Sequence, residues 1–538
     1  MKYCRYEPRN YRTIMETYSV GSLSAKVVDY WGYDPQQTAS FFRGTKIAIP
    51  QADCLEKASA ILTEAAARKQ KAFVYGDYDC DGICATAIMV KLLQKLGISC
   101  GYYIPNRFNE GYGLNLERVR QAREKGYELL ITVDNGVSAF EAVDWARKNG
   151  MTVLISDHHE LSAPINADCL VHPSLLTEEF RWLCGAGVAY VLMEYLHLAD
   201  EQMKICAMVA TIGDVMELRD YNVQLVREGL KALAGHRYRN MEALLEGSEM
   251  IDENAVSFRI VPKINAVGRL ADRANPNQLV RYFLAEDEKV IDDFAAQLSE
   301  LNNTRKQMSL AQYETVRKKL DLSHDFLMVR DESLHEGLIG LMASRLCDET
   351  GRSCLIFTES NGLLKGSGRG NETTDLFDLL KDYAPYTVNF GGHKGACGIT
   401  IRPEQYDELR EYIAQRYVSE TVEKEEYYIE ITEGDLTKDN LEELFSHKPF
   451  GQGRKLPLFL IRTDDSWEYR SLRNDNQLKW SKRLQQTRFD IVSFRNNKGY
   501  REYLDRDTEA LGNLEINVFR GVKSYQLLAL QLETAGLK

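Results

Sequence analysis

Residues 71–82, KAFVYGDYDCDG, open with an apolar stretch and end in a turn that holds three aspartates. The apolar part has the character of a buried strand, and residues 85–96 that follow predict a helix. Strands are also expected at 128–133 and 151–155, with a helix over 139–149 between them. Strands alternating with helices predict a parallel sheet covered by helices on both faces, which binds ligands at the carboxyl ends of its strands.

Acidic and imidazole side chains collect at these strand ends. We also expect the apolar run 207–212 to be strand-like and to deliver a further acid at the same edge. An aspartate at such a turn is often a helix cap, but capping does not explain two adjacent histidines. The side chains in question are Asp77, Asp79, Asp81, Asp134, Asp157, His158, His159 and Asp214.

This set of side chains predicts a metal site. Carboxylate oxygens with one imidazole suit Mn²⁺ or Mg²⁺, and a carboxylate bridging two ions about 3.5–4 Å apart makes a phosphoryl-transfer site. The alternating aspartates followed by Gly82 also resemble the start of an EF-hand loop. That alternative fails because position 12, counted from Asp77, is Ile88 where the loop needs Glu.

Composition limits the function further. The chain has 538 residues, 44% hydrophobic and 27% charged, which predicts a globular protein of about three or four domains. No apolar run approaches the ~18 residues that cross a bilayer, and residues 1–15 lack the apolar stretch of a signal peptide, so we expect a cytoplasmic protein with no membrane contact. The net charge of −12 argues against non-specific DNA coating. The 11 scattered cysteines indicate neither a zinc site nor a disulfide framework.

Beyond the first unit the chain predicts two more. Residues 277–320 have helical apolar spacing and predict a long connecting helix. A second α/β unit follows, with strands at 326–329 and 354–357. Alternating residues at 514–519 and 526–532 then predict a small β-barrel. The expected fold is therefore an α/β parallel-sheet domain, a long helix, a smaller α/β domain and a C-terminal barrel.

The acidic motifs, in this order and spacing, resemble those of the DHH phosphoesterases, and along nearly its whole length the chain is similar to the RecJ exonucleases. The resemblance implies an N-terminal segment 1–46, a DHH domain 47–275, a connecting helix 276–320, a DHHA1 domain 321–418 and an OB-fold 425–538. Further segments that carry it are 105–113, 183–188, 264–269, 366–369, 391–398 and 449–453.

The resemblance also implies roles for the acidic residues. Asp134 would bridge two ions, and His159 would face the scissile phosphate, with Asp157 counted among the catalytic residues. Tyr75 stands where many relatives outside RecJ have a metal-binding histidine, which implies weaker binding of the first ion. One ion would be bound by Asp81, His158 and Asp214, and the other by Asp79 and Asp77.

Other motifs predict contacts with nucleic acid. Gly391, Gly392, His393 and Lys394 would let backbone N–H groups approach a phosphate, although a tight turn between strand and helix explains them too. In RecJ relatives the motifs containing the following residues form a pocket for the 5′ phosphate: Arg107, Asn265, Arg269, Ser367 and Arg369.

Residues 471–500 combine a basic stretch with Trp480, Phe489 and Phe494. Aromatic rings beside a basic groove hold single strands in OB-folds by stacking on bases. Placement of the same rings in the barrel core is the alternative. The seven basic residues are Arg473, Lys479, Lys482, Arg483, Arg488, Arg495 and Lys498.

The function implied is metal-dependent 5′-to-3′ hydrolysis of single-stranded DNA to mononucleotides, in repair or recombination. The partners implied are single-stranded DNA, a RecQ-type helicase and a single-strand-binding protein, with the chain a monomer. Two alternatives stay open. One is a DHH phosphodiesterase for short oligonucleotides or cyclic dinucleotides, against which the third unit argues. The other is an inactive DNA-binding scaffold, against which the intact acidic motifs argue.

Overall fold

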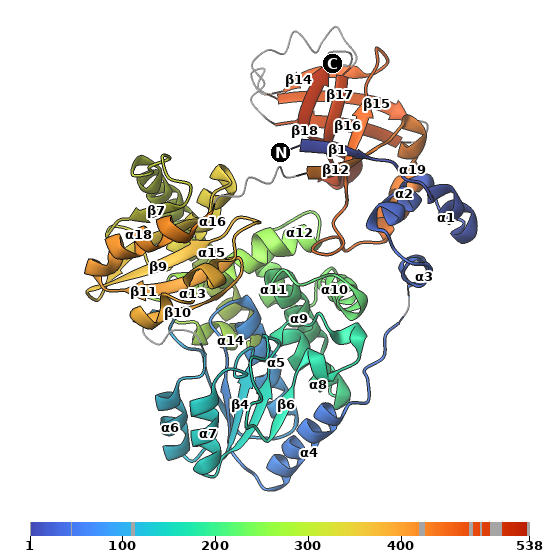
Figure 1. Cartoon of the computed structure of the whole chain (residues 1–538). Helices are drawn as coiled ribbons and strands as arrows, with labels where there is room; N and C mark the ends of the chain where they lie inside the picture. The colour runs from blue at the N-terminus through green and yellow to red at the C-terminus, as the bar shows by residue number, and fades with distance from the viewer. Residues whose placement is uncertain are drawn as a thin grey trace.

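The computed structural model describes residues 2–44, 46–108, 113–418, 425–472, 477–484, 487–494 and 508–534 (Figure 1). Three sheets organise this part of the chain, two with five strands and one with eight. Hydrophobic clusters pack separately around each sheet. None of the described helices combines the length and the apolar character needed to cross a membrane.

The first sheet lies in the blue-to-green body of Figure 1 and is parallel throughout, with the order β3-β2-β4-β5-β6. Leu129 and Ile131 face one hydrophobic cluster, and Leu130 between them faces another, so both faces are covered as expected. The strands are β2 (Ala72–Tyr75), β3 (Cys100–Tyr103), β4 (Leu129–Val133), β5 (Thr152–Ser156) and β6 (Cys169–Val171).

Helices cover the two faces of this sheet unequally. The larger cluster packs one face against α4 (Asp53–Ala67), α5 (Cys80–Lys95), α8 (Gly185–Tyr195) and α9 (Glu201–Gly213). The other face carries α6 (Leu116–Glu124) and α7 (Phe140–Lys148).

The prediction that residues 207–212 are strand-like is wrong, because they lie inside α9. Asp200 caps that helix by accepting from the backbone N–H groups of Gln202 and Met203. All but the last of the six apolar-run residues are buried, and a short apolar run that is buried on every side has no periodicity that separates helix from strand. Asp214 is therefore presented by the C-terminus of a helix.

Helices lead from the first sheet to the second. The expected long helix is confirmed as α15 (Glu288–Lys318), but it begins where Asp287 caps it. Residues at the start of the predicted range form the separate helix α14 (Asn277–Leu284). The preceding elements are α10 (Asp220–Leu233), α11 (Arg239–Leu245), α12 (Glu253–Ala255), a π-helical turn (Val256–Ile260) and α13 (Val261–Arg269).

The second sheet has the order β10-β11-β9-β8-β7, with only β7 and β8 parallel. It lies at the left of Figure 1 with α16 (Ile339–Thr350) and α18 (Tyr406–Arg416). The short helix α17 (Leu376–Leu380) contacts its strands β10 and β11. Its strands are β7 (Leu327–Arg330), β8 (Cys354–Ser360), β9 (Leu363–Arg369), β10 (Asn389–His393) and β11 (Ala396–Ile401).

The third sheet joins the two ends of the chain. Strand β1 (Lys2–Tyr6) pairs in parallel with β12 (Glu425–Glu430), and α2 (Ser22–Trp31) packs on α19 (Lys438–Ser446) (Figure 1). Helices α1 (Tyr11–Tyr18) and α3 (Pro35–Arg43) flank α2. The other strands are β13 (Leu458–Arg462), β14 (Glu468–Leu472), β15 (Gln477–Leu484), β16 (Thr487–Ser493), β17 (Thr508–Phe519) and β18 (Val522–Thr534).

Helix α2 completes the core of the third sheet. Leu23 is fully buried in the same cluster as Trp467 and Trp480. Lys26 forms a salt bridge of 2.8 Å to Asp435, which also accepts a hydrogen bond from the Ser22 hydroxyl. Helix α2 thus stabilises a domain whose sheet is built mainly by β12 to β18.

We expect Leu23→Ala to lower the free energy of unfolding of this domain by about 2–5 kcal/mol, because it leaves a cavity in the core. Urea unfolding followed by tryptophan fluorescence measures the change. The control is Leu310→Ala on α15, whose side chain is 59% exposed and should change stability by under about 0.5 kcal/mol. Equal effects of the two substitutions would show that α2 does not contribute to this core.

Candidate metal centre

The site lies at the point where the first sheet reverses its strand order. Strand β2 has β3 on one side and β4 on the other, so the connections that leave β2 and β4 diverge. Loops after these strands open a crevice at the carboxyl edge of a parallel sheet. The aspartate turn follows β2, Asp134 follows β4 and residues 157–159 follow β5.

The aspartate turn is fixed by its own side chains. Asp79 caps α5, since its Oδ1 accepts from the N–H groups of Asp81 at 3.0 Å and Gly82 at 3.1 Å. From α13, Asn265 accepts a hydrogen bond of 2.8 Å from the N–H of Cys80. Gly82 must be glycine, because a Cβ there would lie 2.6 Å from the Cα of Asp77.

Asp81 reaches across to the start of α8. Its two carboxylate oxygens accept from the N–H groups of Gly185 and Ala186, each at 2.7 Å. The N-terminus of a helix favours negative charge, so α8 holds this carboxylate in place. A Cβ on Gly185 would lie 2.6 Å from the Cβ of Asp134, and this close approach accounts for the glycine.

Asp134 adopts the left-handed backbone conformation, with φ of 59°. A non-glycine residue in this region carries strain on the order of 1 kcal/mol or more, and such residues cluster at functional sites. The residue is 2% exposed. Its Oδ1, and the Oδ1 of Asp77, are buried without a hydrogen bond. Buried carboxylate oxygens without partners are what a cation would satisfy.

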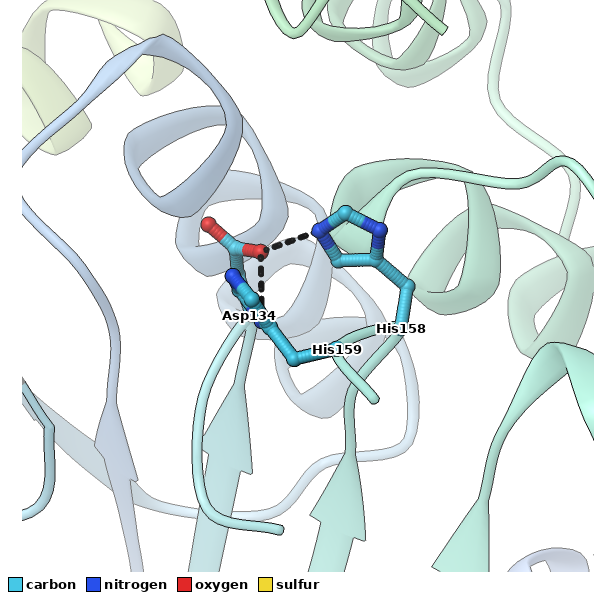
Figure 2. A group of neighbouring side chains, drawn as sticks. All are labelled: Asp134, His158 and His159. Atoms are coloured by element: carbon cyan, nitrogen blue, oxygen red, sulfur yellow. Dashed lines mark ion pairs between the residues drawn. The ribbon is translucent and has the colours of Figure 1, made fainter. Parts of the chain in front are cut away.

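The two histidines approach Asp134 from the end of β5 (Figure 2). Nε2 of His158 lies 3.2 Å from Oδ1 of Asp134, 3.6 Å from Oδ2 of Asp81 and 3.7 Å from Oδ2 of Asp214. Nδ1 of His159 lies 4.0 Å from Oδ1 of Asp134. One ring therefore lies between three carboxylates, and the other lies beside them with its side chain 43% exposed.

Asp157 orients this loop. Its Oδ1 lies 2.8 Å from Nδ1 of His159 and accepts from the N–H of His158, while its Oδ2 accepts from the N–H of Val137. The residue is fully buried and is absent from the metal-ligating groups of the described chain. Its contacts with the site include the His159 ring and the backbone N–H of His158.

Three overlapping groups of side chains have ligand atoms within 4.8 Å of one another. Two of them coincide with the ligand sets stated above, and Asp134 is shared between groups. Tyr75, at the position where many relatives outside RecJ have a metal-binding histidine, is fully buried, and its hydroxyl donates to the backbone oxygen of Gly113 at 3.2 Å. The groups are Asp81, His158 and Asp214; Asp77, Asp79 and Asp134; and Asp134, His158 and His159.

Crowding and burial of the carboxylates shift the pKa values of the residues in this site. Burial raises the pKa of Asp77 and of Asp134 well above the ordinary value, and neighbouring aspartates raise both further. Burial and the charge of Asp81 raise the pKa of Asp214 to about 8. Although burial opposes it, the hydrogen bond to Asp157 raises the pKa of His159 to about 9. Divalent cations would stabilise the ionised forms of these carboxylates.

An arginine cluster lies beside the aspartate turn. Burial, followed by the charges of Arg107, Arg305 and Arg369, lowers the pKa of Arg269 to about 10. The guanidinium of Arg107 lies 5.4 Å from the ring centroid of Tyr78. Guanidinium groups that crowd together attract a phosphate.

The cluster combines both α/β domains. Arg369 comes from β9, two residues after Ser367 on the same face of the strand, and its Nε donates to the Ser344 hydroxyl at 2.7 Å. Sequence reasoning missed Arg305 on α15, whose Nε donates to Oδ1 of the buried Asn302 at 3.0 Å. Two polar residues three positions apart are typical of the exposed face of a long helix, so no local pattern in the sequence identifies Arg305 as part of the arginine cluster. Asn265 contacts the aspartate turn, as described above.

The glycine-rich segment is a β-hairpin, so the alternative of a turn between strand and helix is wrong. Strands β10 and β11 pair antiparallel, with Gly391 opposite Gly398. Gly392 needs to be glycine, because its Cβ would lie 2.3 Å from the backbone oxygen of Ala396. Gly391 has open space around it, and it is exposed together with His393 and Lys394.

The expectation that Trp480 and Phe489 stack on bases is not met. They are 4% and 0% exposed, because β15 and β16 direct them into the domain core. Phe494 is 56% exposed and remains available. Lys479 pairs with Asp490 at 2.7 Å. Lys482 pairs with Glu433, Arg488 approaches Asp490 at 3.2 Å, Arg483 is on β15, and Arg473, Arg495 and Lys498 lie outside the described residues.

Comparison with known proteins agrees with this geometry. Residues 71–213 match the family model of the DHH family N-terminal domain, residues 323–419 that of the DHHA1 domain, and residues 429–531 that of the RecJ OB domain. The single-stranded-DNA-specific exonuclease RecJ of Haemophilus influenzae is 32% identical over 529 residues, covering 89% of this chain and 90% of its own. The chain belongs to the RecJ family.

Other RecJ proteins extend the comparison. The Bacillus subtilis RecJ is 29% identical over 546 residues, which cover 96% of this chain and 68% of that protein. The crystal structure of RecJ in complex with Mn²⁺ from Thermus thermophilus superposes with a TM-score of 0.83 at 26% identity, over 100% of this chain and 80% of that one. Its complex with Mg²⁺ gives 0.77 at 25% identity, over 100% and 78%. The shared fold includes all three sheets.

We expect Asp134→Asn to raise the melting temperature in EDTA and to remove the stabilisation that Mn²⁺ gives the unmodified protein. Asparagine tolerates the left-handed backbone, and its neutral amide removes the repulsion between residue 134 and the neighbouring carboxylates. Each kcal/mol of stability gained in this way raises the melting temperature by about 2–4 °C. Thermal unfolding with and without Mn²⁺ measures both effects. The control, Asp407→Asn on α18, changes a 76% exposed carboxylate and should alter neither. Equal Mn²⁺ stabilisation of all three proteins would contradict a metal centre at Asp134.

Proposed function

We propose that the protein is a metal-dependent exonuclease that hydrolyses single-stranded DNA to mononucleotides from the 5′ end. One observation carries the proposal: a group of carboxylates and imidazoles lies beside a cluster of arginines, close enough for Arg269 to interact electrostatically with Asp79. The first group suits two divalent cations and the second suits a terminal phosphate. Relatives over most of the chain are named single-stranded-DNA-specific exonucleases.

The ligand sets follow from the three groups of side chains. Asp81, His158 and Asp214 would hold one ion, Asp77 and Asp79 the other, and Asp134 would lie between them. The RecJ crystal structures with Mn²⁺ and Mg²⁺ support either metal as the natural one. When bound, two such ions activate water for attack on phosphorus and neutralise charge on the phosphate oxygens.

The chain's own residues position the substrate. Asp157 holds His159 at the exposed side of the crevice, where its ring can donate to a phosphate oxygen. The half-buried Arg269, with Arg107 and Arg369, would bind the 5′ phosphate and so place the first phosphodiester bond over the carboxylates. Gly391 and Lys394, exposed on the β10–β11 hairpin, would contact the strand's backbone, as would Gly392 and His393.

Several expectations rest on the resemblance alone. We propose on that basis that the chain acts as a monomer in the cytoplasm, in repair or recombination, with a RecQ-type helicase and a single-strand-binding protein as partners. The domain division at residues 46, 275, 320 and 418 is proposed on the same basis.

With Mn²⁺, we expect rapid release of mononucleotides from the 5′ end of 5′-phosphorylated single strands and slow cleavage of blunt duplexes. Asp134→Asn should reduce the rate by about a thousandfold or more, because it removes charge that stabilises the transition state. Labelled oligonucleotides, marked at either end and resolved by size, measure direction and strand preference.

Other products would contradict this function. Turnover confined to dinucleotides or very short oligomers would identify a small-substrate phosphodiesterase. Binding of single strands without cleavage in Mn²⁺ or Mg²⁺ would identify a scaffold.

A second prediction concerns the 5′ phosphate. Arg107→Gln should raise KM for 5′-phosphorylated strands about tenfold or more, through loss of a charge-assisted hydrogen bond, and leave KM for 5′-hydroxyl strands unchanged. Arg120→Gln, at a partly exposed arginine on α6, is the matched control. A similar rise in KM for both strand types would contradict a terminal-phosphate contact.

A further inference from the structure

A cationic cavity, separate from the arginine cluster beside the metal centre, lies between the first sheet's domain, the N-terminal helix α3 and the loop that leads into the third sheet. Its volume is about 560 Å³. Five basic and three acidic side chains line it, an excess of positive charge in a chain whose net charge is −12. The lining residues that matter here are Phe41, Arg181, Trp182, Arg219, Arg227 and Arg454.

Arg454 is the decisive residue. It is 4% exposed, and its Nε is buried without a hydrogen-bond partner. One Nη donates to the backbone oxygen of His447 at 2.8 Å, and the guanidinium lies 4.6 Å from the ring centroid of Phe41. No carboxylate of the described chain forms an ion pair with it. A buried charge without a counter-ion is costly, and a bound anion would satisfy it.

Arg227 repeats this arrangement at the exposed side of the cavity. Its Nε and Nη2 donate to the backbone oxygens of Lys448 and His447, and among the described residues it too has no ion pair. Both arginines also lower the pKa of His447, whose burial lowers it to about 4, so this ring does not add positive charge at neutral pH.

The acidic residues that line the cavity do not neutralise Arg227 or Arg454. Glu178 pairs with Arg181 at 3.0 Å, and Glu228 pairs with Lys204. Asp220 has no ion pair in the described chain, and burial raises its pKa. At the rim, the guanidinium groups of Arg181 and Arg219 lie 5.2 and 5.8 Å from the ring centroid of Trp182. The cavity thus combines uncompensated arginines with an aromatic face.

The cavity is connected to the metal centre through the chain. Trp182 precedes Gly185, whose N–H binds Asp81, by three residues, and Arg219 follows Asp214 by five. Asn222 ties the two segments together, donating to the backbone oxygen of Glu217 at 3.0 Å and also to that of Trp182. A ligand in the cavity would therefore contact the same two segments that carry residues of the metal centre.

We propose that this cavity binds the phosphate group of a nucleotide, held by Arg227 and Arg454 with Trp182 at its rim, at a place separate from the metal centre. The nucleotide belongs either to the DNA strand or to the released mononucleotide. The proposal deepens the proposed function, since both sources are its substrate and product. An alternative in which Arg454 only braces the loop at His447 and packs on aromatic rings leaves its Nε without a partner. It also leaves the charge of Arg227 without a counter-ion among the described residues.

The test measures binding in EDTA, so it does not depend on cleavage and a failure of the proposed nuclease activity would be seen separately. Full-length protein is titrated against a fluorescent 20-nucleotide strand at several salt concentrations and, by calorimetry, against thymidine 5′-monophosphate. The variants are Arg227→Gln, Arg454→Lys and Trp182→Leu. The control is Arg237→Gln, at an arginine that is 69% exposed and approaches Glu201. Thermal unfolding verifies that each variant is folded.

If the strand is the ligand, Arg227→Gln should weaken strand binding about tenfold and make the slope of log affinity against log salt shallower by about 0.7, the value for one phosphate contact. Trp182→Leu should weaken binding without changing that slope, since it removes a ring and no charge. If the free nucleotide is the ligand, the three variants bind the strand as the unmodified protein does. Calorimetry then shows that they have lost one thymidine 5′-monophosphate site per chain. All three variants behaving like Arg237→Gln with both ligands would overturn the proposal.

Discussion

Several carboxylates are buried together at the edge of a parallel sheet, and the surrounding structure serves to keep them there. Asp134 is held in a left-handed conformation by the end of β4, with its Oδ1 lacking a hydrogen bond. Such an arrangement is unfavourable without cations, because burial and like charge both oppose ionisation. The helix N-terminus at Gly185 and the cap at Asp79 offset part of this cost. Bound metal ions would offset the rest.

The second α/β domain is placed by contacts with the first. A Cβ on Gly337 would lie 1.8 Å from the backbone oxygen of Arg269, so the two domains meet where α13 ends. Phe108 packs edge-on against His335, with ring centroids 5.6 Å apart, and the amine of Lys365 donates to the backbone oxygen of Phe108 at 3.2 Å. Arginines from both domains consequently interact electrostatically with one another beside the carboxylates. This closeness is why a strand end and its first phosphodiester bond could be held at once.

Much of this could be predicted from the sequence, because strand ends and turn residues are local signals. The parallel sheet, and the meeting of Asp81, Asp134 and His158 at its edge, follow from chain order. Predictions failed where only tertiary packing decides. The run before Asp214 is helical, and Trp480 and Phe489 point into the core instead of toward DNA. Arg305, the pairing of β1 with β12 and the cavity at Arg454 depend on contacts between distant segments, and no local pattern encodes them.

The central claim is that Asp134 lies between two metal ions. Anomalous diffraction at the manganese edge, from crystals soaked in Mn²⁺, tests it most directly. The account predicts two peaks about 3.5–4 Å apart, one beside Asp81, His158 and Asp214 and the other beside Asp77 and Asp79, with the Asp134 carboxylate between them. A single peak, or peaks out of reach of the Asp134 oxygens, would contradict it.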